Sequence, residues 1–278
     1  MRLRALVSLI LAWVLAACAV AAGTAAYGAQ GESPAIAFYY GAEPPWTELQ
    51  AFDIAVVDPD QVTGALPVLP QTRLVAYVSV GEVQPTRGYA KDIPAAWLAG
   101  TNPAWGSRLI DQSQPAWPSF FVDKVVAPLW DKGYRSFFLD TLDSYQLFAQ
   151  TAEQRAAQEA GLVAVVGAIK QRYPEAQLIF NRGFEILDRT SGQVTAVAAE
   201  SLFQGYDAGK HAYRPVAEAD RAWLLEQLKR VRDELKLPVF VIDYVPAAQR
   251  ELARATARRI EEAGFVPWVA SGDLATLG

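Results

Sequence analysis

The feature that most constrains the fold is a regular alternation of short apolar runs with longer amphipathic stretches. Eight apolar runs are typical of short buried strands, and the stretches between them carry hydrophobic residues at helical spacing. Strands that alternate with helices predict a parallel sheet, and eight in about 230 residues predict an α/β fold of the closed (β/α)8 TIM-barrel type. The predicted strands are 36–40, 54–57, 74–80, 136–139, 178–181, 195–199, 239–243 and 265–269, and the clearest predicted helices are 151–172, 218–235 and 247–263.

Polar and aromatic side chains lie at or near the C-terminal ends of these predicted strands. In a parallel barrel all of those ends meet on one face, where such folds place their catalytic groups. Some of the acids also have structural explanations, because Asp58 can form a turn, Asp140 can cap a helix and Asp243 can anchor a loop. The residues in question are Tyr40, Asp58, Asp60, Tyr77, Ser79, Glu82, Asp140, Asp143, Asn181, Glu200, Asp243, Tyr244 and Trp268.

The composition disfavours several classes of enzyme. The sequence has one cysteine, Cys18, and one histidine, His211. A zinc site of the usual ligand types and a thiol nucleophile are therefore not expected, and His211 is the sole possible base for a Ser-His-Asp triad. The sequence contains no phosphate-binding Gly-rich loop, dinucleotide fingerprint or G-x-S-x-G elbow. We expect no metal and no cofactor. The chemistry is expected to depend on carboxylates, tyrosines and amides.

The N-terminal residues form a targeting pattern. A positively charged start precedes an almost wholly apolar stretch, 5–23, that ends in small residues, as in a secretory signal. The letters LAAC at 15–18 also match a bacterial lipobox, which would leave Cys18 as a lipidated N-terminus; ordinary signal cleavage is the alternative. We interpret 1–29 as a signal peptide or lipoprotein signal with a short tether, and 34–278 as one barrel domain. The protein is expected to be exported, to the periplasm, the medium or, through a lipid at Cys18, a bacterial membrane.

A long excursion, 81–132, separates the third and fourth predicted strands. It carries Trp97, Trp105, Trp117 and Trp130 together with many prolines, and a helix is predicted over 115–132. These tryptophans either form the core of the excursion or expose aromatic faces. Exposed aromatic planes around an acidic cleft are typical of sites that stack sugar rings.

Five sequence motifs occur in order at these strand ends. They are VVDPD at 56–60, AYVSVGE at 76–82, FLDTLDS at 138–144, NRGFE at 181–185 and AES at 199–201. Together they resemble glycoside hydrolase family 114, the endo-α-1,4-polygalactosaminidase-like barrels, which include the hydrolase domain of proteins that process the cationic Pel exopolysaccharide. The resemblance covers essentially all of 36–268. It implies a (β/α)8 fold and hydrolysis of α-1,4 linkages in polymers that contain galactosamine or N-acetylgalactosamine.

The resemblance places the two catalytic carboxylates at Asp140, after the fourth strand, and Glu200, after the sixth. Glycosidases use two carboxyl groups across the scissile bond to stabilise an oxocarbenium-like transition state. We predict that Asp140 is the nucleophile and Glu200 the general acid/base of an endo-acting, retaining enzyme.

The remaining strand-end residues have predicted binding roles under this hypothesis. The partner is expected to be a polysaccharide, cationic where its galactosamine is deacetylated, attracted by an anionic cleft. The net charge of −5 and pI near 5.1 agree with such a partner and disfavour nucleic acid. Arg182 is expected to pair with one of the acids, and the protein is expected to be a monomer. The predicted substrate-binding residues are Tyr40, Asp58, Asp60, Tyr77, Ser79, Glu82, Asp143, Asn181, Tyr244 and Trp268.

Two other functions stay open from the sequence. A non-catalytic barrel that binds polysaccharide during exopolysaccharide assembly would use the same acids and tryptophans. A hydrolase of a different α-linked glycan would keep the residues and change the substrate. Because acids occupy both expected catalytic positions, the sequence favours an enzyme.

Overall fold

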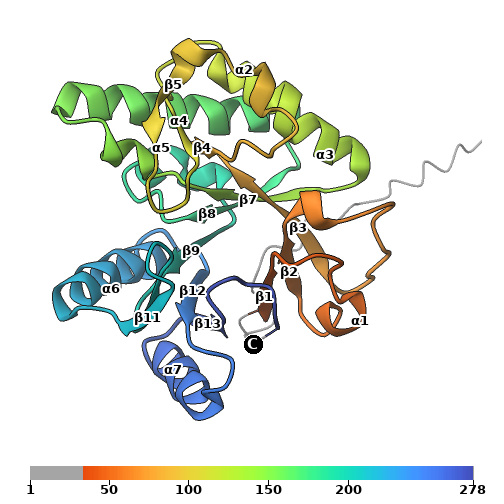
Figure 1. The fold of residues 1–278 in the computed structure, drawn as a ribbon, viewed down its shortest axis with the longest axis vertical. Coiled ribbons are helices and arrows are strands. Elements are labelled where there is room, and N and C mark those ends of the chain that lie inside the picture. The colour runs from red at the N-terminus through yellow and green to blue at the C-terminus, as the bar shows by residue number, and fades with distance from the viewer. Residues whose placement is uncertain (1–33, 278) are drawn as a thin grey trace, which may run out of the picture.

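The computed structural model describes residues 34–277 (Figure 1). The predicted signal segment and the lipobox at Cys18 lie outside the described residues, so export and lipidation stay predictions. Among residues 34–277, none of the helices combines the length and the apolar character that crossing a membrane requires.

Eight parallel strands form the central sheet, as the alternating pattern predicted. They pair in the order β1-β2-β3-β7-β8-β9-β12-β13, and each neighbouring pair is parallel. The predicted strand ends are within one or two residues of the observed ones. The strands are β1 Ile36–Tyr39, β2 Ile54–Val57, β3 Arg73–Ser79, β7 Ser136–Asp140, β8 Gln177–Asn181, β9 Ala196–Glu200, β12 Val239–Tyr244 and β13 Val266–Ala270.

The sheet curves into a nearly closed barrel, which confirms the predicted TIM-barrel fold. β1 and β13 are its edges, and the Tyr40 backbone N–H donates to the carbonyl of Leu274, just beyond β13, at 2.8 Å. Every residue of β2 and of β12 is buried. A strand that is covered on both faces has no polar side, and this explains the continuous apolar runs in the sequence.

Helices cover the outside of the barrel (Figure 1). The three longest are α4 Ala152–Arg172, α6 Glu218–Asp233 and α7 Arg250–Glu262, with bounds within three residues of those predicted. α4 begins with a capping box, in which the Thr151 side chain accepts from the Gln154 N–H and the Gln154 side chain accepts from the Thr151 N–H. The shorter elements are α1 Trp46–Leu49, α5 Leu187–Thr190 and the 3-10 turns Pro59–Gln61, Ala90–Asp92, Ala95–Trp97, Ser144–Leu147 and Ser191–Gln193.

The excursion between β3 and β7 is more elaborate than the single predicted helix. Its first part is an antiparallel sheet in the order β4-β6-β5, and its second part has three helical segments. Pro128 has no N–H to donate to the preceding turn, and the hydrogen-bond pattern changes at this point of the helix. These elements are β4 Glu82–Val83, β5 Leu98–Thr101, β6 Arg108–Ile110, α2 Trp117–Phe121, the π-helical segment Val122–Val126 and α3 Ala127–Lys132.

A second small sheet follows β9 and was not predicted. It is an antiparallel hairpin of β10 Gln204–Asp207 and β11 Ala212–Pro215. Its strands are short and mix polar, aromatic and small residues, so no apolar run marks them in the sequence. The hairpin lies on the side of the barrel where β9 and β12 end (Figure 1).

Candidate active site

Asp140 and Glu200 are brought together across the strand that separates them. Asp140 ends β7, Glu200 ends β9, and Asn181 ends β8 between them. The amide nitrogen of Asn181 donates to Asp140 Oδ1 at 2.7 Å and to Glu200 Oε1 at 2.8 Å. The two predicted catalytic acids therefore meet at one point of the barrel mouth.

The Asn181 amide limits the separation of the two acids. Because the two carboxylate oxygens lie 2.7 and 2.8 Å from one nitrogen, they are at most about 5.5 Å apart, short enough for both acids to contact one bond of a substrate. Asn181 is 7% exposed, and its own Oδ1 has no hydrogen-bond partner among residues 34–277. A buried acceptor without a partner beside two acids is available for an N–H or O–H of a ligand.

Two tyrosine hydroxyls hold the outer oxygens of the acid pair. Tyr77 on β3 donates to Asp140 Oδ2 at 2.8 Å, and Tyr244 at the end of β12 donates to Glu200 Oε2. Tyr40 packs its ring against that of Tyr77, with the centroids 4.9 Å apart. Burial and then the nearby carboxylates raise the pKa of all three tyrosines well above the usual value, so the hydroxyls remain neutral donors.

The acid pair retains a proton in mildly acidic solution. Burial and, secondly, the negative charge of Glu200 raise the pKa of Asp140 from 3.8 to about 6, while hydrogen bonds from Tyr77 and Asn181 act in the opposite direction. Carboxyl groups this close titrate as a pair rather than independently. One carboxyl is then protonated while the other is ionised, which is the state that paired-acid catalysis requires.

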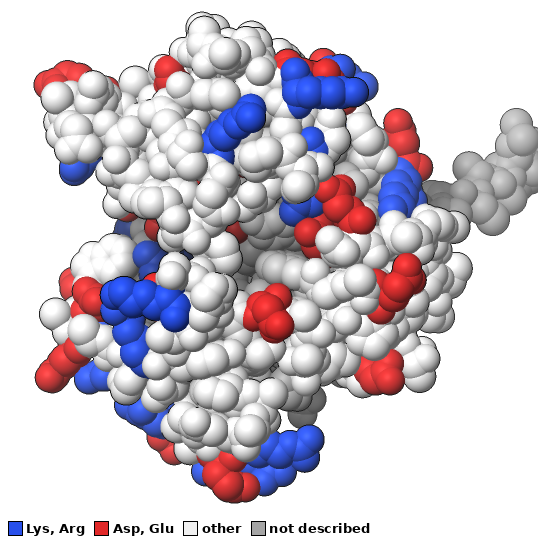
Figure 2. Space-filling model, in the orientation of Figure 1, with Lys and Arg blue, Asp and Glu red and all other residues white. Residues whose placement is uncertain are grey.

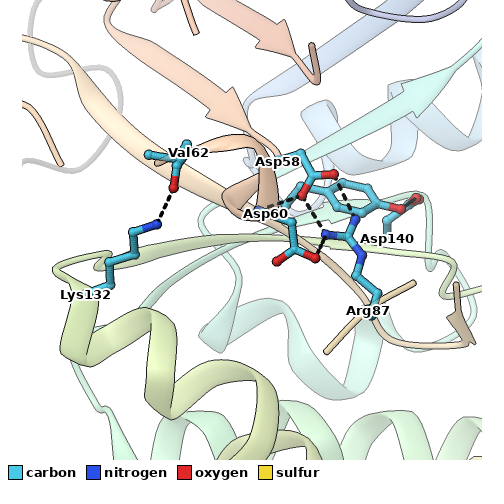
Figure 3. Close-up of polar contacts among 7 residues, drawn as sticks. Asp58, Asp60, Val62, Arg87, Lys132 and Asp140 are labelled. Atoms are coloured by element: carbon cyan, nitrogen blue, oxygen red, sulfur yellow. Dashed lines mark hydrogen bonds and ion pairs between the residues drawn. The ribbon is translucent and has the colours of Figure 1, made fainter. Parts of the chain in front are cut away.

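Arg87 neutralises part of the expected anionic wall (Figure 3). Its guanidinium contacts Asp58 at 2.6 and 3.0 Å and Asp60 at 2.8 Å. It also lies 5.7 Å from the ring centroid of Tyr77, whose hydroxyl binds Asp140. One cation between two acids leaves a single net negative charge here. Arg87 was not predicted as a site residue, because it lies in the excursion and no strand-end pattern marks it.

Glu82 and Ser79 make hydrogen bonds within the protein. Glu82 is 5% exposed, and its carboxylate accepts hydrogen bonds from Asn102 at 2.9 Å, Ser144 at 2.5 Å and Ser107. The Ser79 hydroxyl donates to the Glu82 carbonyl at 2.8 Å. These bonds satisfy the buried carboxylate and tie the excursion to the barrel, and the substrate contacts expected of the two residues stay predictions.

A comparison with known proteins identifies the family. The model of glycoside hydrolase family 114 matches residues 16–278. The chain belongs to glycoside hydrolase family 114. The resemblance of the strand-end motifs is thereby confirmed, and in the structure the family 114 chain brings acids from two of these motifs together at the barrel mouth.

Solved structures show the same barrel. The glycoside hydrolase domain of PelA from Pseudomonas aeruginosa is 35% identical, and the match covers 88% of this family 114 chain and 98% of that domain with a TM-score of 0.79. Aspergillus fumigatus Ega3, solved in complex with galactosamine, is 15% identical over 89% of this chain and 96% of that chain, with a TM-score of 0.62, and shows the fold alone. An uncharacterized protein of Thermotoga maritima is 24% identical over 84% of this chain and 79% of its own length.

Asp143 lies at the edge of the family 114 site and is paired. Arg182 Nη1 is 3.5 Å from Asp143 Oδ2, which confirms the predicted pairing of Arg182 with an acid, and Arg182 Nη2 donates to the Glu200 carbonyl at 2.5 Å. Figure 2 shows that this face is hollowed near its centre and that acidic and basic side chains are interspersed around the hollow. The acids that were expected to line an anionic cleft are partly paired, and Asp60 and Asp143 remain 54% and 36% exposed.

Several tryptophans that could have bound sugar are packing residues. Trp268 is 6% exposed and meets the ring of Phe52 edge-on with the centroids 5.6 Å apart, and its predicted sugar contact stays a prediction. Trp97 and Trp117 pack against each other within the excursion, with the centroids 6.4 Å apart. Trp105, by contrast, is 58% exposed.

Asp243 anchors the segment that follows Glu200, which is the structural alternative stated from the sequence. Asp243 is fully buried and accepts the backbone N–H groups of Leu202 at 2.6 Å and of Phe203 and Gln204 at 2.8 Å. Burial raises the pKa of Asp243 from 3.8 to about 6, although the three backbone donors lower it. The sequence indicated a loop anchor or a site acid here, and the structure shows the anchor.

An open depression of about 510 Å³ lies at the opposite end of the barrel, by the N-terminal ends of β3 and β7. Its lining includes Leu66, Thr72 and Ser136. The described site residues are at the other end of the strands, so we assign no part of the chemistry to this depression.

Proposed function

We propose that this family 114 chain hydrolyses α-1,4 linkages within a galactosamine-containing exopolysaccharide. The observation that carries the proposal is the acid pair, Asp140 and Glu200, joined by Asn181 at the barrel mouth. Glycosidases need two such carboxyl groups, one to donate a proton and one to stabilise or attack the anomeric carbon. The family and the 35% identity with the hydrolase domain of PelA support hydrolysis as the reaction.

The spacing of the pair favours a retaining mechanism. The bridged oxygens are at most about 5.5 Å apart, which is compatible with the roughly 5–5.5 Å of retaining enzymes and below the roughly 6.5–9.5 Å of inverting ones. In the proposed first step the proton shared by the pair is on Glu200, the Asp140 carboxylate attacks the anomeric carbon, and Glu200 gives that proton to the departing glycosidic oxygen. Water then attacks the glycosyl ester, Glu200 takes a proton from that water, and Asp140 leaves as a carboxylate.

The substrate class is supported by exposed charge and by a free acceptor. The exposed carboxylates of Asp60 and Asp143 can attract the ammonium groups of deacetylated galactosamine. Asn181 Oδ1 supplies an acceptor for an N–H or O–H of the sugar held at the acid pair. The A. fumigatus structure shows that a barrel of this fold accommodates galactosamine.

The test is hydrolysis of a panel of polymers by the full chain, followed by proton NMR during the first turnovers. The panel contains fully acetylated and partly deacetylated α-1,4-galactosamine polymers and a neutral α-linked galactan. We expect new α-configured reducing ends from the galactosamine polymers and a rapid fall in chain length, because cutting is internal. Binding without release of ends supports the non-catalytic alternative, release from the neutral galactan alone supports a different hydrolase, and β-configured ends contradict retention.

The raised pKa of Asp140 predicts an acidic optimum. With the pKa of Asp140 at about 6, the acid pair holds one proton below that pH and loses it above. The reactive state has one proton, so kcat/KM should fall about tenfold per pH unit above pH 6. The profile is measured with an acetylated oligomer, which has no amine to titrate. A constant kcat/KM from pH 6 to pH 8 would show that the two acids do not share the proton.

A further inference from the structure

The β10–β11 hairpin carries an aromatic pair beside the site. Tyr206 and Tyr213 are directly opposite in the antiparallel register, so both side chains lie on one face of the hairpin. Their ring centroids are 4.9 Å apart, and Tyr213 is 37% exposed. His211, in the connection between the two strands, is exposed, and its Nδ1 lies 3.1 Å from the Tyr206 hydroxyl.

A line of tyrosine rings connects this face to the acid pair. The centroid of Tyr206 is 6.3 Å from that of Tyr244, and the Tyr244 hydroxyl donates to Glu200. Glu200 is the proposed proton donor, and the sugar next to a proton donor is the leaving group of the cleaved bond. Because Tyr244 ends β12, which lies on the other side of β9 from β7, the rings of Tyr206 and Tyr213 continue from the Glu200 side of the acid pair.

The hairpin is held rigidly on the barrel. Asp243 accepts the N–H of Gln204, the first residue of β10. The Gly272 N–H, in the segment after β13, donates to the Tyr213 hydroxyl at 3.0 Å. A Cβ atom on Gly272 would lie 2.5 Å from the Tyr206 ring, so this segment already packs closely on the pair. An aromatic surface that is ordered before binding loses little conformational entropy when a ligand stacks on it.

The charges of the hairpin leave stacking as its main contact with a sugar. Asp207 is 3.6 Å from Lys210 and 3.9 Å from Arg214. Because neighbouring residues of a strand point to opposite faces, Asp207 and Arg214 lie on the other face from the two tyrosines. An ammonium group on the tyrosine face would find no unpaired hairpin carboxylate, whereas the apolar face of a pyranose matches an aromatic ring.

We propose that the face formed by Tyr206 and Tyr213 binds one hexosamine ring of the polymer on the leaving-group side of the acid pair. The ring stacks on Tyr213, whether or not its nitrogen is acetylated. This subsite rests on the proposed polysaccharide hydrolysis and adds to it a sugar position that takes no part in the bond cleavage. It lengthens the binding surface beyond the acid pair, as an enzyme that cuts within a chain requires.

The test is the variant Tyr213→Ala, compared on two substrates. With hexosamine oligomers of six sugars, acetylated or not, we expect KM to rise about tenfold, because one aromatic contact is lost. With an aryl α-galactosaminide, which has no sugar on the leaving-group side, kcat/KM should stay unchanged. Tyr213→Phe keeps the ring and should restore the KM of the unaltered protein. Trp223→Ala removes a different exposed aromatic, on α6, and should leave KM unchanged.

An unchanged KM for the oligomers in Tyr213→Ala overturns the subsite. An equal loss on the aryl substrate also overturns it, because the acid pair would then have been disturbed. If the unaltered protein cleaves nothing, the hydrolysis proposal fails, and the same variants are compared by calorimetric titration with the acetylated hexamer. Weaker binding by Tyr213→Ala that recovers in Tyr213→Phe then supports the subsite by itself. Equal binding by all three proteins, or no binding, overturns it.

Discussion

Asp140→Asn is expected to lower kcat on the galactosamine polymer by at least about 10⁴-fold, because the amide cannot form the glycosyl ester. The same exchange removes a half-buried negative charge beside Glu200, and desolvation already disfavours that charge. The folded state is therefore not expected to lose stability. Initial rates of reducing-end release and a thermal unfolding midpoint on the same sample separate the two effects.

Asp143→Asn is the matched control for this variant. It makes the same chemical change three residues later, at a side chain that is 36% exposed and pairs with Arg182 rather than with the acid pair. We expect a loss in kcat of less than about tenfold, since an exposed ion pair contributes little. If Asp140→Asn keeps a hundredth or more of the original kcat with an unchanged unfolding midpoint, Asp140 is not the nucleophile. Glu200→Gln combined with Asp140→Asn should lose little more than either change alone, because the two acids act as a unit.

Asp243→Ala is expected to lower the free energy of unfolding by roughly 3–5 kcal/mol, since it leaves one buried and two part-buried backbone N–H groups without their acceptor. These groups belong to residues 202–204, immediately after Glu200. Loss of their anchor should displace Glu200 and the base of the β10–β11 hairpin as well. Urea unfolding gives the stability, and kcat on the aryl substrate reports the position of Glu200.

Asp243→Asn is the conservative variant for this position. Its amide oxygen can still accept from the backbone, so we expect a smaller loss of about 1–2 kcal/mol and a smaller decrease in kcat. A decrease in stability of less than 1 kcal/mol for Asp243→Ala would mean that water replaces the carboxylate, and that the anchor is not needed for the fold.

The strands and their order could be predicted because their signal is local. A strand segment that is buried on both faces is mostly apolar, as in β2 and in the first four residues of β12, and the helices between strands must show the 3.6-residue period. Once eight such strands alternate with helices, their C-terminal ends lie on one face, and the approach of Asp140 and Glu200 follows from topology. The position of the acid pair could therefore be predicted from the sequence.

The elements that the sequence analysis missed have weak local signals. The β10–β11 hairpin has no apolar run, and the three-stranded sheet of the excursion is built from strands of two to four residues. Arg87 contacts Asp58, which is 29 residues away in the chain, through a fold of the excursion that no periodicity describes. Pairings of this kind depend on the path of a loop, and many paths are compatible with one sequence pattern.

The sequence by itself determined the barrel, the order of its strands and the gathering of acids at its C-terminal face, because burial imposes a repeating pattern on each element. The tertiary structure decided which of those acids are free to act. It placed Asn181 between Asp140 and Glu200, satisfied Glu82 with buried donors, paired Asp58 and Asp60 with Arg87, and used Asp243 to anchor a backbone segment. The role of a carboxylate depends on its donors, charges and solvent within a few ångströms, and those neighbours come from distant parts of the chain.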